Sequence, residues 1–325
     1  MEREHSVLPV NLDLALKVFD KQKVSFGRHE TFALRFSWLS KGFHAFARDP
    51  SVFSSDDATV ALGVGKNMVH SIYYWMEAAQ LIGKATRGMD STPVGKRVFD
   101  EKTGFDPYLE DEATIWLVHW LIASNARNAT SFYWFFNHYH NYEFDGERLT
   151  RALQDFAEEK ITARTAESSI KKDISVLLRM YALAKKSKGR HADEDALDSP
   201  LALLELIDNV EMNATYLSQP QNRENLPVHI LGFALAQLFQ HTSARMFPVE
   251  ELAYPGAALP SLASVFRLTE DALLGKLERL TRQFPGDWDI RETAGLRQIY
   301  LLQEKADSMS YLEDYYSGTR GRKAA

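Results

Sequence analysis

The stretch SSDDATVALGVGKNMVHSIYYWMEAAQLIG, from Ser54 to Gly83, predicts two helices joined by a tight turn. The serines and aspartates at its start suit a helix N-terminus, because side-chain oxygens cap free N–H groups and acids favour the positive end of the dipole. The two glycines in the middle permit a sharp change of direction. Beyond them, apolar residues at three- and four-residue spacing predict the buried face of a longer helix: Val69, Ile72, Tyr73, Met76 and Ala79. This pattern is typical of a helix-turn-helix, although an ordinary helical hairpin would share it.

The flanking residues extend this pair of helices to a winged helix. Residues 84–99 are rich in glycine, proline and basic residues between apolar ends, which predicts a β-hairpin with a basic tip. Glu30 to Leu39 has helical spacing, with Gly42 as a stop, and predicts the first helix of the same unit. We therefore expect an N-terminal winged-helix domain over residues 24–104. The longer helix after the glycine turn would enter the DNA major groove.

Basic and polar side chains of this domain are the candidates for contact with DNA, because cations meet phosphates and a polar helix start faces the bases. A basic segment farther along the chain is a second candidate surface, although a solvated helix with a charged linker would look the same. The candidates are Arg28, Arg35, Lys66, Asn67, His70, Ser71, Tyr74, Arg87, Lys96, Arg97, Lys171 and Lys172.

The rest of the chain predicts further helical units, so the expected fold class is mainly α, with tandem helix-turn-helix-like units and small β-hairpin wings. Residues 105–192 predict a helical middle with two buried aromatic helices and a second helix-turn-helix candidate. Residues 200–316 predict a C-terminal winged-helix-like domain, preceded by a linker over 191–200. Residues 317–325 predict a disordered tail.

Composition limits the possible functions. The chain has 325 residues, 45% of them hydrophobic, which is enough for two or three packed domains. The formal charge of −6 means that DNA binding would require local basic faces. The absence of cysteine excludes disulfides, thiolate metal sites and cysteine nucleophiles. No signal peptide or membrane-length apolar run is evident, so we expect a cytoplasmic protein without a membrane partner.

Five side chains suited to catalysis lie in three places along the chain. The adjacent His29 and Glu30 could share a proton or bind a metal, although such a pair is more often a cap or a surface pair. Asp106 and Asp111 could join Glu30 in holding Mg²⁺ or another divalent cation, but acids at this place also complement a helix dipole, which we favour. His119 is a further candidate general base.

Five blocks of the sequence together resemble a bacterial family of unknown function that includes SspB-type DNA phosphorothioation nickases and is encoded beside PAPS-reductase-like proteins. The blocks are residues 27–42, 62–75, 92–99, 106–124 and 293–300. The resemblance implies a role in replacing a non-bridging phosphate oxygen of DNA by sulfur. It also implies sulfur-transfer and ATPase partners, with this chain binding and nicking double-stranded DNA. It assigns no catalytic residue.

Three functions remain open from the sequence. The first is a DNA nickase, which the resemblance favours. The second is a non-catalytic DNA-binding subunit that presents DNA to sulfur-transfer partners, which the helix-turn-helix patterns favour. The third is a transcription-factor-like scaffold that binds proteins, which the acidic net charge would suit. A homo-oligomer is compatible with each of them.

Overall fold

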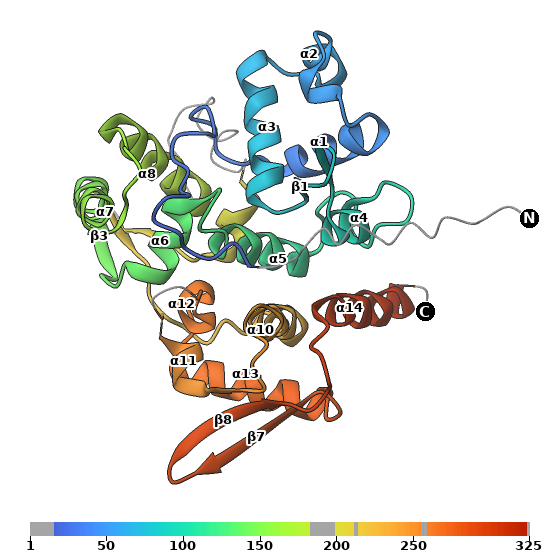
Figure 1. The fold of residues 1–325 in the computed structure, drawn as a ribbon, viewed down its shortest axis with the longest axis vertical. Coiled ribbons are helices and arrows are strands. Elements are labelled where there is room, and N and C mark those ends of the chain that lie inside the picture. The colour runs from blue at the N-terminus through green and yellow to red at the C-terminus, as the bar shows by residue number, and fades with distance from the viewer. Residues whose placement is uncertain (1–15, 183–198, 211–213, 255, 257–258, 324–325) are drawn as a thin grey trace, which may run out of the picture.

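The computed structural model describes residues 16–182, 199–210, 214–254, 256 and 259–323. In these ranges the protein is mainly helical, with three small antiparallel sheets. The N-terminal part lies at the top of Figure 1 and the C-terminal part at the bottom, with two aromatic helices between them. No helix in the described ranges is long and apolar enough to span a membrane.

The N-terminal part contains the two helices predicted around the glycine turn. Helix α2 (Ala58–Leu62) ends at Gly63, whose φ of +60° is a left-handed conformation that glycine adopts without strain. Helix α3 (Lys66–Ala78) begins after Gly65, and the predicted apolar residues are buried except Tyr73, which is half-buried. The short helix, turn and long helix are therefore confirmed. The other elements of this part are α1 (Phe36–Arg48), η1 (Val52–Ser54), β1 (Ile82–Lys84), β2 (Met89–Ser91) and α4 (Pro93–Phe99).

The middle part consists of helices and a small three-stranded sheet. Its strands follow the spatial order β3-β5-β4, so the last strand in sequence lies between the other two. The elements are α5 (Glu112–Ala123), α6 (Thr130–His138), β3 (Glu143–Asp145), α7 (Gly146–Lys160), α8 (Glu167–Tyr181), η2 (Pro200–Leu204), β4 (Asp208–Val210) and β5 (Thr215–Leu217).

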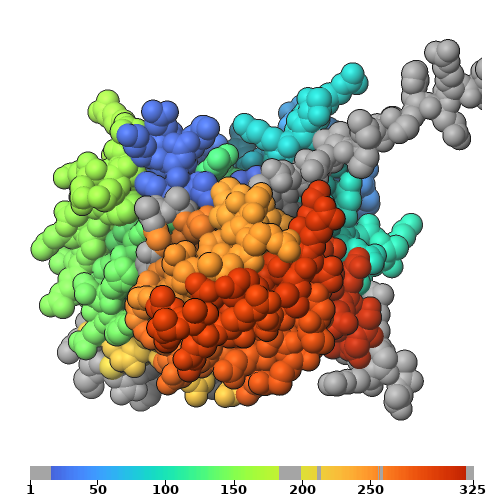
Figure 2. Space-filling model, turned by 60° about the horizontal axis from the view of Figure 1, so that its bottom comes forward, coloured from blue at the N-terminus to red at the C-terminus, as the bar shows by residue number. Residues whose placement is uncertain are grey.

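The C-terminal part has a similar order of elements, with a sheet of order β6-β8-β7. Figure 1 shows the long β7–β8 hairpin below the helices, and Figure 2 shows that this part covers a continuous face of the molecule. The elements are α10 (Val228–Thr242), β6 (Met246–Pro248), α11 (Val249–Ala253), α12 (Leu262–Phe266), α13 (Glu270–Gln283), β7 (Trp288–Thr293), β8 (Leu296–Leu301) and α14 (Ser308–Lys323).

The two aromatic helices predicted in the middle form the centre of the core. Nearly every residue of α5 and α6 is buried, because these helices are packed on all sides. Trp120 of α5 stacks on Phe266 of α12 with ring centroids 5.6 Å apart, which joins the middle to the C-terminal part. One hydrophobic cluster accordingly extends from Leu16 to Tyr316.

The first helix of the N-terminal unit is not where the sequence predicted it. The expected helix from Glu30 to Leu39 is replaced by α1, which begins at Phe36. Glu30 and Thr31 have left-handed φ values of 49° and 66°, and the backbone from Phe32 to Arg35 is not helical. Local spacing failed here because tertiary contacts hold this segment in a turn, as described below.

Two further expectations are corrected. The hairpin predicted over 84–99 is shorter: its strands are β1 and β2, and Lys96 and Arg97 lie on α4. Thr92 caps α4 by accepting from the Gly95 N–H, and Pro93 follows as a favourable first helical residue. The tail predicted to be disordered from residue 317 is helical to Lys323 as part of α14. The linker predicted over 191–200 lies largely outside the described residues.

Candidate functional site

The start of helix α3 is an exposed polar surface. Lys66, Asn67 and His70 are exposed on its first turns, as expected for side chains that face a partner. Ser71 and Tyr74 are buried instead, because they fall on the face of the helix that packs inward. The predicted DNA-contact set is therefore divided: its first three members on α3 are accessible, and the last two are part of the interior.

The other basic candidates differ in what they contact. Arg87 is exposed in the loop between β1 and β2, and Lys172 is exposed on α8. Lys96 and Lys171 are exposed and pair with Asp90 at 3.7 Å and with Glu167 at 2.6 Å. Exposed pairs of this kind contribute little to stability and can be exchanged for a phosphate.

Two arginines of the predicted set have a packing role. Arg97 pairs with Glu313 of α14 at 2.9 Å and lies over the ring of Phe105 at 4.9 Å, so it joins the N-terminal and C-terminal parts. Arg35 is half-buried, with its guanidinium 5.5 Å from the centre of the Trp38 ring.

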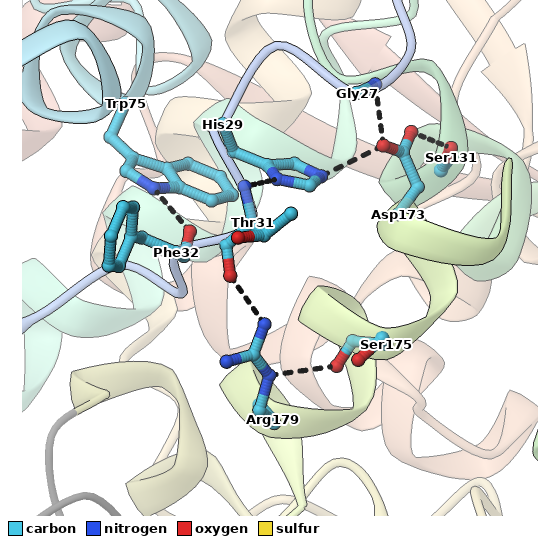
Figure 3. Close-up of polar contacts among 9 residues, drawn as sticks. All are labelled: Gly27, His29, Thr31, Phe32, Trp75, Ser131, Asp173, Ser175 and Arg179. Carbon is cyan, nitrogen blue, oxygen red and sulfur yellow. Dashed lines mark hydrogen bonds and ion pairs between the residues drawn. The ribbon is translucent and has the colours of Figure 1, made fainter. Parts of the chain in front are cut away.

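A buried histidine–aspartate pair fixes the segment that precedes α1. His29 Nε2 lies 2.8 Å from Asp173 Oδ1, and both side chains are almost completely buried. The same carboxylate accepts from the Gly27 N–H at 2.6 Å and from the Ser131 hydroxyl at 2.5 Å. Figure 3 shows these contacts converging on Asp173, with the His29 ring parallel to that of Trp75. We call His29, Asp173 and Ser131 the latch.

The latch also explains the left-handed turn. The Thr31 N–H donates to His29 Nδ1 at 3.1 Å, so neutral His29 carries its proton on Nε2 and donates it to Asp173. Arg179 donates to the Thr31 carbonyl, and the Trp75 indole donates to the Phe32 carbonyl at 3.2 Å. These contacts hold residues 27–32 against α3 and α8 (Figure 3). His29 points inward, and its neighbours Arg28 and Glu30 are therefore exposed.

Arg28 and Glu30 line a pocket of about 710 Å³ against α3. Its other walls come from α3, from the end of α1, from η1 and from β2, so it lies beside the exposed start of α3. The lining residues are Arg28, Glu30, Phe46, Pro50, Phe53, Ser54, Val69, His70, Tyr73, Tyr74, Glu77 and Met89. Four of the predicted site residues therefore meet in one place: Arg28, Glu30, His70 and Tyr74.

Glu77 is the most unusual charged group of this pocket. Burial raises the pKa of the Glu77 carboxyl, while the positive charges of Arg28 and Lys84 act in the opposite direction. Burial, together with the nearby Glu77 charge, raises the pKa of the Tyr73 hydroxyl. The pocket thus combines a cation, two carboxylates and aromatic walls, which is the composition of a site for a polar ligand with a flat ring.

The second predicted acid group caps a helix. Asp106 is buried and accepts from the Glu110 N–H at 2.9 Å, the Asp111 N–H at 3.0 Å and the Thr114 hydroxyl at 2.6 Å. Asp111 is the N-cap of α5, accepting from the Ala113 N–H at 2.9 Å and from the hydroxyl of Tyr315 in α14 at 3.0 Å. These contacts fit the favoured helix-start interpretation.

Magnesium has no built site among these residues. Within the described ranges, no group of three or more histidine, aspartate or glutamate side chains is placed to hold a metal ion. Glu30 lines the α3 pocket, whereas the Asp106 carboxylate is occupied by three protein donors. The predicted metal ligands therefore do not fit a cation as they stand, and we assign no chemical step to one.

His119 lies in the interior. Its Nδ1 is 2.9 Å from the Tyr181 hydroxyl, and its Nε2 is 2.8 Å from the Val265 carbonyl, so the ring joins α5 to α8 and α12. Nε2 carries the proton, because a carbonyl can only accept. Burial lowers the pKa of His119 to about 3, so the ring is neutral near pH 7.

This burial predicts acid sensitivity. An unfolded chain binds a proton at His119 below about pH 6.5, and the folded protein does not until about pH 3, so stability falls as the pH drops through this window. We expect a loss of about 1.4 kcal/mol per pH unit from this one group. Urea unfolding between pH 6 and 4.5 should show a shallower slope of unfolding free energy against pH for His119→Gln than for wild type. Equal slopes would contradict the assignment.

The comparisons with known proteins agree with the fold. A family model described as "Protein of unknown function (DUF4007)" matches residues 26–316. The chain belongs to the DUF4007 family. Two crystal structures of SspB, one with a bound magnesium ion, are similar over 91% of this chain and 89% of theirs, with sequence identities of 29% and 28% and TM-scores of 0.78 and 0.79. A search of curated proteins finds no match.

Sequence reasoning missed three residues that shape the α3 pocket and the latch. Tyr73 was assigned to the buried apolar stripe of α3, and its ring lines the pocket instead. Glu77 is one turn farther along the same face, and its acidic side chain within an apolar stretch was an available signal. Asp173 lies 144 residues from His29, and no local pattern connects them.

Proposed function

We propose that this DUF4007 protein binds double-stranded DNA in a bacterial DNA phosphorothioation system and nicks one strand to allow sulfur incorporation. In this proposal the N-terminal unit acts as a winged helix, with α3 in the major groove and the β1–β2 hairpin as the wing. The similarity to SspB supports the phosphorothioation context. Sulfur-transfer and ATPase proteins of such a system are the partners that we propose.

One observation carries the DNA-binding proposal: Lys66, Asn67 and His70 are exposed together on the first turns of α3, directly after the glycine turn. The hairpin borders the same pocket as this helix, because Met89 of β2 and His70 of α3 both line it. The loop of this hairpin carries the exposed Arg87. A polar helix start with a cation on the adjacent hairpin is the arrangement with which winged helices contact bases and phosphates.

The mutational test compares two surfaces. We expect Lys66→Ala and Asn67→Ala to weaken duplex binding about three- to tenfold each, since each removes one phosphate or base contact. Fluorescence anisotropy with a labelled duplex measures this, and thermal unfolding checks that each variant is folded. The control variant Lys160→Ala removes an exposed lysine at the end of α7 and should bind as wild type. Unchanged affinity in both α3 variants, with a loss in Lys172→Ala, would move the contact to α8.

A non-catalytic DNA-binding subunit is the second candidate function. Burial of His29, His119 and Asp106 favours it, because a buried side chain does not reach a phosphate. Among the predicted catalytic residues, Glu30 is exposed and Asp111 is partly exposed as a helix cap. In our proposal, nicking therefore depends on the pocket lined by Glu30 and His70. His29 contributes indirectly, because it fixes the turn that carries Glu30.

A further inference from the structure

The α3 pocket has a shape and chemistry that the binding of an intact duplex does not use. Its volume of about 710 Å³ lies within the range of about 300–1,000 Å³ that small-molecule sites occupy. A recognition helix presents side chains to the groove, whereas this pocket is a recess beside the helix. A group the size of one nucleotide, still attached to the DNA bound by α3, would fit this recess.

The walls of the pocket suit a nucleobase. The Phe53 and Tyr73 rings lie 5.2 Å apart at an angle of 55° and both line the pocket, which offers aromatic surface for stacking. Stacking on such a ring strengthens binding for each of the four bases, because every base has an aromatic face. Met89 adds a polarizable apolar wall on the hairpin side.

Two charged side chains of the pocket suit the base edge and the phosphate of a nucleotide. Glu77 is half-buried on α3 and offers carboxylate oxygens, which accept hydrogen bonds from an amino group on a base edge. Arg28 is exposed on the latch-held turn and offers a guanidinium for phosphate. Arg28 and Glu77 line the same pocket, so one ligand can reach both.

We propose that the α3 pocket receives a single nucleotide extruded from the bound DNA, stacked on Tyr73 beside Phe53, with its base edge at Glu77 and its phosphate at Arg28. This inference rests on the proposed DNA binding, and it specifies that the bound DNA has one nucleotide rotated out of the duplex. An extruded nucleotide leaves its phosphodiester exposed beside Glu30 and His70. Enzymes that act on one nucleotide of a duplex commonly gain access in this way.

The proposal predicts a preference among DNA structures. Extruding a paired nucleotide costs a few kcal/mol of pairing and stacking, and an unpaired nucleotide avoids most of this cost. A duplex with a single bulged cytosine should therefore bind at least about tenfold more tightly than the matched duplex. A bulged thymine should bind about fivefold less tightly than a bulged cytosine, because its O4 accepts a hydrogen bond where cytosine N4 donates one to Glu77.

Anisotropy titrations of the full chain with the matched, bulged-cytosine and bulged-thymine duplexes test the proposal. Tyr73→Ala should lose the preference for bulged over matched DNA, and Glu77→Gln should lose the preference for cytosine over thymine. The control Tyr108→Ala, an exposed tyrosine outside the pocket, should keep both ratios. Far-UV circular dichroism verifies folding.

The outcomes separate this inference from the proposed function. Absence of binding to every duplex would refute the proposed DNA binding itself. Binding to the matched duplex without any preference for a bulge would refute the pocket inference and leave DNA binding intact. A preference for bulged DNA that survives Tyr73→Ala would also overturn the inference, because the preference would then reflect DNA bending elsewhere on the surface.

Discussion

Asp173→Ala is expected to lower the free energy of unfolding by about 3–5 kcal/mol, one of the largest effects of any single substitution in this protein. The carboxylate accepts from three buried or half-buried donors: Gly27 N–H, His29 Nε2 and the Ser131 hydroxyl. Alanine would leave all three without a partner in a site where water does not replace it. The segment that carries Arg28 and Glu30 would then lose its attachment to Asp173 of α8 and keep the bond from Arg179 to the Thr31 carbonyl.

Urea unfolding of wild type, Asp173→Ala and the double variant with His29→Ala measures this effect. We expect the double variant to lose less than the sum of the two single losses, because both substitutions break the same contact. The control Asp155→Ala removes an exposed carboxylate on α7 and should change stability by less than about 0.5 kcal/mol. A loss below about 1 kcal/mol in Asp173→Ala would show that the latch does not hold the structure together.

The second large effect concerns nicking. Glu30→Gln is expected to lower the rate of plasmid nicking at least about a hundredfold, the usual contribution of one general acid or base. The substitution keeps the size of the side chain and removes the charge that would take a proton from water. Glu30 lies on the turn held by the latch, where it is exposed and lines the α3 pocket. Of the predicted catalytic groups, it is therefore the best placed to contact a phosphodiester.

A supercoiled-plasmid assay, with and without Mg²⁺, measures the nicking rate, and anisotropy measures DNA binding by the same preparations. Glu158→Gln, an exposed glutamate on α7, is the matched control and should nick as wild type. Nicking by Glu30→Gln at the wild-type rate would remove Glu30 from the mechanism. Wild-type protein that binds DNA and nicks nothing in either condition would favour the non-catalytic subunit.

Local sequence patterns predicted those parts of the fold that local interactions decide. The glycine turn and α3 were predicted because spacing and backbone freedom are properties of neighbouring residues. The burial of α5 and α6 followed from their continuous aromatic composition. Family membership followed from several blocks together, and the DUF4007 match over residues 26–316 confirms it.

The errors occurred where distant contacts decide the local structure. Residues 30–35 have helical spacing, but the latch and the bonds to Arg179 and Trp75 hold them in a turn followed by a non-helical segment. The α3 pocket could not be predicted as a unit, since it forms only when α1, α3, β2 and the latch-held turn come together. The individual residues Arg28, Glu30 and His70 were nevertheless among the predicted site residues.

The central claim is that the N-terminal unit binds DNA through an electrostatic surface, and the salt dependence of duplex binding tests it most directly. Measured by anisotropy between 50 and 200 mM salt, log K for wild type should fall linearly with log salt concentration, since each phosphate contact releases counterions. Lys66→Ala should reduce this slope by about one. Binding that does not change with salt, or no binding at low salt, would contradict the account.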